Sequence, residues 1–391
     1  MLKILGLAIS ALVLGGCASQ HSSLFPPLPP LTQAQLWQDE AFHYHAEQTV
    51  ENIQSLLQLD DDLVSSLKLS DRQDLSVDRR IEIMIAHLYG PNGINLNYQS
   101  GHSTGAMQTW QAKRGDCLSL TLLTYAVTQA LGIPAHMQEV RVPPVIDRRS
   151  GVDFINGHVN VFIRNSAAVR INGHSFQSGG MVIDFEPQVG SRQWGVALSE
   201  SEIAARYYNN RASENLLAHD FDRAYAYYRA AIGSDPQFAA AYGNLGLLYV
   251  QHGLTQSAER LLRHAIALNG SSNAPLHALL QLLRTQGRTE EATQVAAQLE
   301  KRQTEDPYYW LGQGLQALQK EQYGKAVYAL QRAEALAVGF AEIHRYLAYA
   351  YWRNQQPKRA REQLALLTAL DQLDPGVSVL EKKMSATKLV Q

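Results

Sequence analysis

The chain has 391 residues, enough for two or three domains. Its 34 basic and 36 acidic residues give a formal net charge of −2, and neither half is strongly basic, which argues against nucleic acid as the main partner. Cys17 and Cys117 are the only cysteines, so a disulfide-stapled scaffold and a multi-cysteine zinc site are both excluded.

The first 17 residues, MLKILGLAISALVLGGC, contain an apolar run over residues 4–14. The run has the length of a signal-peptide core and is too short to span a membrane as a helix. The sequence Leu-Gly-Gly-Cys17 at its end resembles a bacterial lipobox. The resemblance implies removal of residues 1–16 and lipidation of Cys17. Because Ala18 rather than Asp follows, it also implies the periplasmic face of the outer membrane, with membrane contact through the lipid only. The alternative is a plain secretory signal with an incidental cysteine.

Residues 17–35 are predicted to be a tether. Four prolines between residues 26 and 30 favour an extended polyproline-II segment that holds the folded part away from the membrane. A docking motif for a partner domain is the alternative. Residues 36–90 are mostly helical in pattern and end at the turn Gly-Pro-Asn-Gly over residues 90–93.

Cys117 follows Gly115-Asp116 at a predicted helix start, and the helix is expected to end at Leu-Gly-Ile-Pro over residues 131–134. A cysteine in the first turn of a helix lies at the positive end of the helix dipole, which lowers the thiol pKa and increases the thiolate fraction. Two strand patterns follow, residues 157–163 with His158 and residues 181–187 with Asp184.

These residue types suit nucleophilic catalysis. His158 would take the thiol proton and later protonate the leaving amine, while Asp184 would hold the imidazole in the correct tautomer. The sequence also offers competing bases and a competing set of orienting carboxylates, namely His102, His136, His174, Asp147 and Asp153.

This region resembles the core of the transglutaminase-like superfamily over residues 75–195. The resemblance is carried by Lys113-Arg114-Gly115-Asp116-Cys117, by Leu131-Gly132-Ile133-Pro134, by the His158 strand and by the Ile183-Asp184 strand. It implies a papain-like α+β core over residues 36–198, in which one helix packs on an antiparallel sheet. Cys117 would be the nucleophile, His158 the base and Asp184 the orienting residue.

The substrate side of this predicted site is less defined. His136 stands where the superfamily commonly has an arginine, so the substrate contacts remain open. The backbone N–H of Cys117 is the natural first donor to an oxyanion. The side chains of Gln108 and Trp110 are the candidates for a second donor.

The C-terminal half contains alanines at a constant spacing of 34 residues, namely Ala224, Ala258, Ala292, Ala326 and Ala360. This period is that of the tetratricopeptide repeat, a helix–turn–helix unit. The second unit matches the repeat consensus at Tyr242, Leu245, Gly246, Tyr249, Ala258, Leu262 and Ala265. The third unit departs from it, since Pro307 comes three residues late. We expect about five repeats over residues 205–375, forming an all-α solenoid, with residues 376–391 as a cap.

The resemblance to tetratricopeptide repeats implies a concave groove for a protein or peptide partner. The implied groove positions are His277, Gln281, Arg284, Leu311, Leu315, Arg345, Tyr349 and Trp352. The alternative for each position is an ordinary packed or solvated side chain.

The sequence therefore predicts a lipid-anchored envelope protein that hydrolyses amide or peptide bonds through an acyl-thioester and recruits a protein through its repeats. No cofactor is implied, and the scattered histidines predict no metal site. Hydrolysis is favoured over acyl transfer because water is abundant and no second amine site is evident. Two alternatives stay open: a non-catalytic envelope scaffold and a protein-crosslinking acyl transferase.

Overall fold

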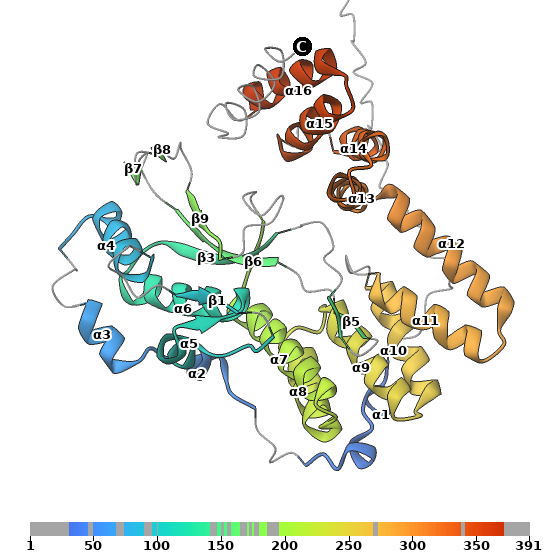
Figure 1. Ribbon diagram of the computed structural model, residues 1–391. Coiled ribbons are helices and arrows are strands. Elements are labelled where there is room, and N and C mark those ends of the chain that lie inside the picture. Colours follow the sequence, from blue (N-terminus) through green and yellow to red (C-terminus); the bar gives the residue numbers. More distant parts are fainter. Residues whose placement is uncertain are drawn as a thin grey trace, which may run out of the picture.

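The computed structural model describes residues 31–45, 50–67, 74–89, 96–99, 101–140, 147–149, 152–154, 158–164, 170–171, 174–175, 180–185, 195–268, 273–337 and 341–370. Cys17, the predicted signal peptide, most of the predicted tether and the predicted C-terminal cap lie outside these residues. Within the described residues, no helix has both the length and the hydropathy to cross a membrane. Figure 1 shows an α+β part followed by an array of paired helices.

The α+β part is built around a four-stranded sheet with the order β10-β3-β6-β9 and antiparallel neighbours throughout. These strands are β3 (Ala135–Val140), β6 (His158–Ile163), β9 (Met181–Ile183) and β10 (Val196–Leu198). Three two-stranded pairs accompany it: β1 (Asn97–Tyr98) with β2 (Arg114–Gly115), β4 (Asp147–Arg149) with β5 (Val152–Phe154), and β7 (Arg170–Ile171) with β8 (His174–Ser175). The helices of this part are α2 (Ile53–Leu56), α3 (Asp61–Leu67), α4 (Val77–Tyr89), α5 (Ala106–Ala112) and α6 (Cys117–Ala130).

Helix α6 packs on one face of this sheet. Successive side chains of a strand point to opposite faces, so Val159, Val161 and Ile163 share one face of β6. They belong to the same buried apolar clusters as residues of α6 such as Leu122 and Val127. Thr121 adds a polar link, since its hydroxyl donates to the carbonyl oxygen of Val159 over 3.3 Å.

The C-terminal part consists of helix pairs, and the predicted tetratricopeptide solenoid is confirmed. The pairs are α7 (Glu200–Leu217) with α8 (Phe221–Ser234), α9 (Ala239–Gln251) with α10 (Thr255–Ala267), α11 (Ala274–Thr285) with α12 (Thr289–Glu305), α13 (Pro307–Gln319) with α14 (Tyr323–Leu336), and α15 (Ala341–Arg353) with α16 (Pro357–Leu370). The five periodic alanines all lie buried in the second helix of a pair. The array begins before the predicted residue 205, because Ser199 caps α7 in a capping box with Glu202.

The late proline of the third unit has a structural consequence. No proline ends α12 at the expected place, so this helix continues to Glu305, and Pro307 becomes the first residue of α13. Figure 1 shows α12 as a long helix between α11 and the group α13–α16. The apolar core of α10–α12 is accordingly separate from that of α13–α16.

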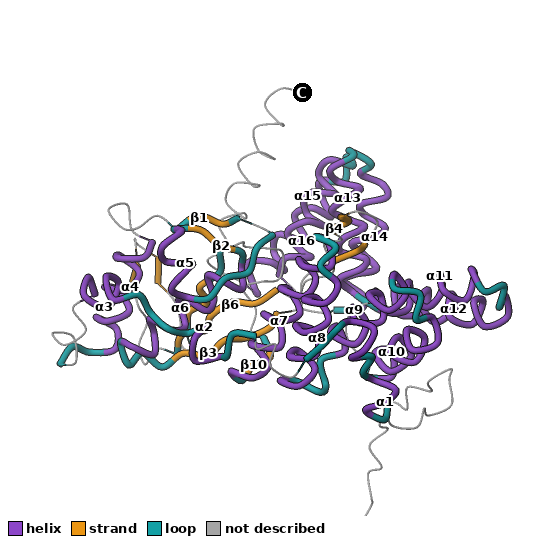
Figure 2. Tube along the Cα trace, turned by 90° about the horizontal axis from the view of Figure 1, so that it is seen from below, coloured by secondary structure: helices purple, strands orange, loops and turns teal. Residues whose placement is uncertain are grey.

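The N-terminal strap, residues 31–44, packs against the array rather than serving only as a tether or as part of the α+β domain. It contains α1 (Gln33–Leu36) and the 3₁₀ helix η1 (Asp39–Phe42). Phe42 is 0% exposed and stacks on Tyr225 and Tyr249, with ring centroids 4.6 and 5.6 Å apart. Figures 1 and 2 both place α1 beside α10. The predicted boundary at residue 36 is therefore wrong for this segment.

Polar contacts complete the docking of the strap. The backbone N–H of Gln38 donates to the Tyr225 hydroxyl over 2.8 Å. The Tyr249 hydroxyl donates to the carbonyl oxygen of Leu36, also over 2.8 Å. Arg229 pairs with Asp39 and lies over the rings of Trp37 and Tyr44, 4.4 Å from each centroid. Aromatic stacking and cation–π contacts thus fix the strap on the first two repeats.

Candidate active site

His158 and Asp184 come from neighbouring strands and are joined by a hydrogen bond. His158 is the first residue of β6, and Asp184 directly follows β9. The distance between His158 Nε2 and Asp184 Oδ2 is 2.8 Å, and the two side chains are 2% and 7% exposed. Since Nε2 is bound to the carboxylate, Nδ1 is the ring nitrogen that can exchange a proton with another group.

Cys117 lies at the end of α6 that is next to the start of β6. It is the first residue of the helix, is partly buried and takes part in no disulfide. Thr121, one turn later on the same face, bonds to the carbonyl of Val159, the residue after His158. The start of α6 therefore lies at the same end of the domain as the start of β6, the strand that carries His158.

The N-terminus of α6 is closely capped. Asp116 accepts hydrogen bonds through Oδ1 from the backbone N–H of Ser119 at 2.8 Å and from the Ser119 hydroxyl at 2.6 Å. An aspartate in this position accepts from an N–H group that has no partner within the helix. Its negative charge also interacts favourably with the positive end of the helix dipole. The cap fixes the backbone at the residue that carries the thiol.

A buried amide pair lies beside His158 on the sheet. Asn160 is two residues further along β6 and thus shares the face of His158. Its Oδ1 accepts from Gln138 Nε2 over 2.9 Å, and Gln138 Oε1 accepts from the backbone N–H of Gly195 over 3.0 Å. Gln138 and Asn160 were not among the predicted site residues. The signal was available, because an asparagine between two valines of a buried strand requires a polar partner.

Two candidates for substrate contacts, Trp110 and His136, pack against other aromatic or charged side chains. Trp110 is buried in the apolar core, where Lys113 Nζ lies 3.1 Å from its ring centroid. His136 pairs with Phe162 near the far end of β6, which removes it from His158. Burial, and next the charge of Arg164, lower the pKa of His136. Gln108 is exposed on α5.

The competing bases and carboxylates have other positions. His102 Nδ1 lies 2.9 Å from Glu214 Oε2 on α7, so its partner is a carboxylate of the array rather than Asp184. Asp147, Asp153 and His174 lie on β4, β5 and β8, and their side chains are outside what the structure describes. Within the described residues, no group of three or more histidine, cysteine or acidic side chains could hold a metal ion.

The predicted groove residues of the array divide by burial. Leu311 is 0% exposed in the core of α13–α16, so its assignment to a groove is wrong: the same helical period serves core and groove positions. Three further residues, Leu315, Tyr349 and Trp352, are partly buried against that core, and Arg345 is partly buried on α15. His277, Gln281 and Arg284 are exposed on α11, at a spacing that places them on one helix face.

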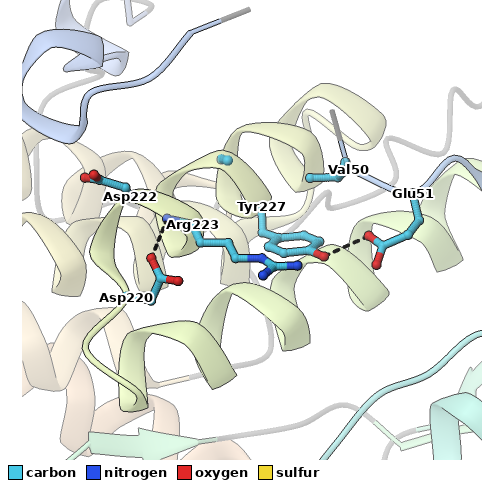
Figure 3. A pocket seen from close by; sticks show the side chains of 7 residues that line it. Val50, Glu51, Asp220, Asp222, Arg223 and Tyr227 are labelled. Carbon is cyan, nitrogen blue, oxygen red and sulfur yellow. Dashed lines mark hydrogen bonds between the residues drawn. The ribbon is translucent and has the colours of Figure 1, made fainter. Parts of the chain in front are cut away.

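A cavity of about 630 Å³ lies between the chain after the strap and α8 (Figure 3). It is lined by Val50, Glu51, Asp220, Asp222, Arg223, Ala226 and Tyr227. The Tyr227 hydroxyl donates to Glu51 Oε2 over 2.8 Å. None of the predicted site residues lines this cavity, so it is separate from the candidate active site.

Comparison with known proteins concerns the array. Models of the tetratricopeptide repeat match residues 215–283 and 277–339. No curated protein matches the chain. Similar solved structures include YrrB, described as a TPR protein with an unusual peptide-binding site (17% identity, TM-score 0.24, covering 46% of this chain and 92% of that chain). They also include a MamA protein (18%, 0.24, 43% and 92%) and PilF of Pseudomonas aeruginosa (18%, 0.26, 48% and 86%). The C-terminal part of this chain thus carries tetratricopeptide repeats, a repeat type that mediates protein–protein interaction.

Proposed function

We propose that this chain is a lipid-anchored, thiol-dependent amide hydrolase of the transglutaminase-like type. The observation that carries the proposal is the buried 2.8 Å hydrogen bond between His158 and Asp184. Cys117 begins α6, and Thr121 of this helix bonds to the residue after His158. A histidine oriented by a carboxylate beside a thiol is the arrangement that activates a cysteine nucleophile. Burial of an ionisable pair costs desolvation free energy that its own attraction offsets only when the geometry is good, and such pairs often occur at functional sites.

The proposed reaction uses Cys117 as nucleophile. Its Sγ gives the thiol proton to His158 Nδ1 and attacks the carbonyl carbon of an amide, with the backbone N–H of Cys117 facing the oxyanion. The C–N bond then breaks, and His158 returns the proton to the leaving amine. Water next loses a proton to His158 and attacks the thioester, releasing the carboxylic acid and restoring the thiol. Asp184 stays ionised throughout and stabilises the imidazolium.

The repeats would supply the substrate or a regulatory protein. The strap already covers part of α8 and α9, since Phe42 fills the space beside Tyr225 and Tyr249. We therefore place partner binding on the later repeats, at the exposed face of α11 formed by His277, Gln281 and Arg284 and at Tyr349 and Trp352 of α15. The lipobox-like Cys17 would hold the whole assembly at the periplasmic face of the outer membrane.

An activated ester tests the chemistry without knowledge of the natural substrate. The chain is mixed with p-nitrophenyl acetate and quenched in acid, and the tryptic peptide 115–141 is examined for an acetyl group on Cys117. We expect acetylation in the wild type, none in Cys117→Ser, and at least about a hundredfold slower acetylation in His158→Ala. Equal acetylation rates in wild type and His158→Ala would contradict the proposal.

Added cadaverine distinguishes hydrolysis from acyl transfer. If water resolves the thioester, acetate is the product at every amine concentration. If amines compete effectively, N-acetylcadaverine accumulates and the protein is the crosslinking transferase of the alternative. The scaffold alternative predicts no acetylation of Cys117 above the rate of an ordinary exposed thiol.

A further inference from the structure

A buried chain of hydrogen bonds joins the first helix of the array to the residue before Cys117. The Ser103 hydroxyl donates to Asp116 Oδ2 over 2.5 Å, and the same hydroxyl oxygen accepts from Asn210 Nδ2 over 3.1 Å. Ser103 is 1% exposed and Asp116 is 8% exposed. Asn210 belongs to α7, so a residue of the repeat array takes part in capping the helix that carries the thiol.

A second contact holds the same segment from the side of α7. Glu214 Oε1 accepts from the backbone N–H of Ser103 over 2.7 Å, and Glu214 Oε2 accepts from Arg211 Nη1 over 2.5 Å. On the side of α6, the backbone N–H of Thr104 donates to the Ser119 hydroxyl over 2.8 Å. Residues 103 and 104 are therefore fixed to both helices at once.

Helix α7 is equally tied to the next helices of the array. Asn209, adjacent to Asn210, accepts through Oδ1 from Asn244 Nδ2 of α9 over 3.0 Å. Ser213 lies 3.1 Å from the Tyr228 hydroxyl of α8, and both residues are buried. Helix α7 thus makes side-chain hydrogen bonds both to the α+β part and to neighbouring helices of the array. A displacement of α7 relative to α9 would therefore change the hydrogen bond between Asn210 and Ser103, and through Ser103 the contact with Asp116.

We infer that Asn210 and Glu214 are positioning residues for Cys117, through which the state of the repeat array controls the reactivity of the thiol. The catalytic meaning of this control rests on the proposed function. Asn210 orients the Ser103 hydroxyl toward the Asp116 carboxylate, which lies next to Cys117. When that hydrogen bond is weakened, the carboxylate charge is less compensated and the helix start is less fixed, so a thiolate at Cys117 is disfavoured.

The test is alkylation of Cys117 by iodoacetamide in the full chain, followed on the tryptic peptide 115–141 across pH. In Asn210→Ala we expect alkylation about two- to tenfold slower at pH 7, as expected for the loss of one hydrogen bond, and a profile displaced to higher pH. The matched control is Asn215→Ala, because the Asn215 amide donates within α7, to the carbonyl of Arg211 over 2.7 Å. The control should match the wild type.

Alanine is a good helix former, so α7 is expected to remain intact in both variants, which far-UV circular dichroism checks. Should Asn210→Ala unfold, Glu214→Gln provides the second variant, since it keeps the size of the side chain and removes its charge. The inference would be overturned if the folded positioning variant (Asn210→Ala or Glu214→Gln) had the same alkylation profile as the wild type and as Asn215→Ala. Failure of the proposed function has a different signature: the ester acetylates Cys117 no faster than an ordinary exposed thiol, and at equal rates in wild type and His158→Ala.

Discussion

Phe42→Ala is the substitution that most directly tests the docked strap. Phe42 is fully buried against the rings of Tyr225 and Tyr249, and truncation of a buried phenylalanine costs about 3–5 kcal/mol. The loss cannot exceed the free energy with which the strap docks, because a strap that detaches loses all its contacts. Sequence patterns place this residue in the mostly helical segment 36–90 of the predicted α+β domain, and they do not predict its contact with the repeats.

Hydrogen exchange of the strap measures this loss locally. A cost of about 3 kcal/mol raises the detached population roughly a hundredfold, and amides such as the Gln38 N–H, bonded to the Tyr225 hydroxyl, exchange faster in proportion. Glu40→Ala is the control, since Glu40 is an exposed residue of the same strap. Exchange in Phe42→Ala that is no faster than in Glu40→Ala would refute the docking account.

Three further predictions concern the repeats. Gly314→Ala should lower the free energy of unfolding by about 1–3 kcal/mol, because an added Cβ would lie 2.6 Å from Leu330 Cγ, whereas Gly324→Ala meets no atom within 4 Å and should be neutral or stabilising in a urea titration. Ala258→Leu, at a fully buried helix crossing, should destabilise by a similar amount, and a variant as stable as the wild type would contradict the repeat register. Burial lowers the pKa of His264 below 6.5, so the unfolded chain takes up the proton first as the pH falls. The free energy of unfolding should therefore decrease from pH 7 to pH 5. Thermal melts at each pH should show a smaller decrease in His264→Gln.

The repeat array could be predicted because its packing depends on the size of single residues at fixed positions. Only a small side chain fits where paired helices cross, so alanines such as Ala258 recur at every unit and remain buried. The same reasoning is wrong for Leu311, since an apolar residue at helical spacing suits either the core or a groove. The residues that cover Leu311 depend on where the long helix α12 ends, because a separate apolar core begins after it.

The α+β part was predictable where the sequence alternates strictly. The strand predicted at residues 157–163 is found as β6, and Asp184 follows β9, which pairs with it. Contacts between distant segments were not predictable. Short helices such as η1 are marginal by themselves, and the strap is ordered by rings that lie about 190 residues away, as the pair of Asp39 with Arg229 illustrates. Ser103 and Asn210 likewise meet only because the array docks on the α+β part.

The pH dependence of Cys117 alkylation tests the central claim most directly, because it requires no substrate. The rate of modification of peptide 115–141 by iodoacetamide is measured between pH 5 and 10 for the wild type and His158→Ala. The account predicts that wild-type Cys117 reacts well below the ordinary thiol pKa of about 8.5 and that the His158→Ala profile moves toward that value. Two identical profiles centred near pH 8.5 would contradict a catalytic pairing of Cys117 with His158.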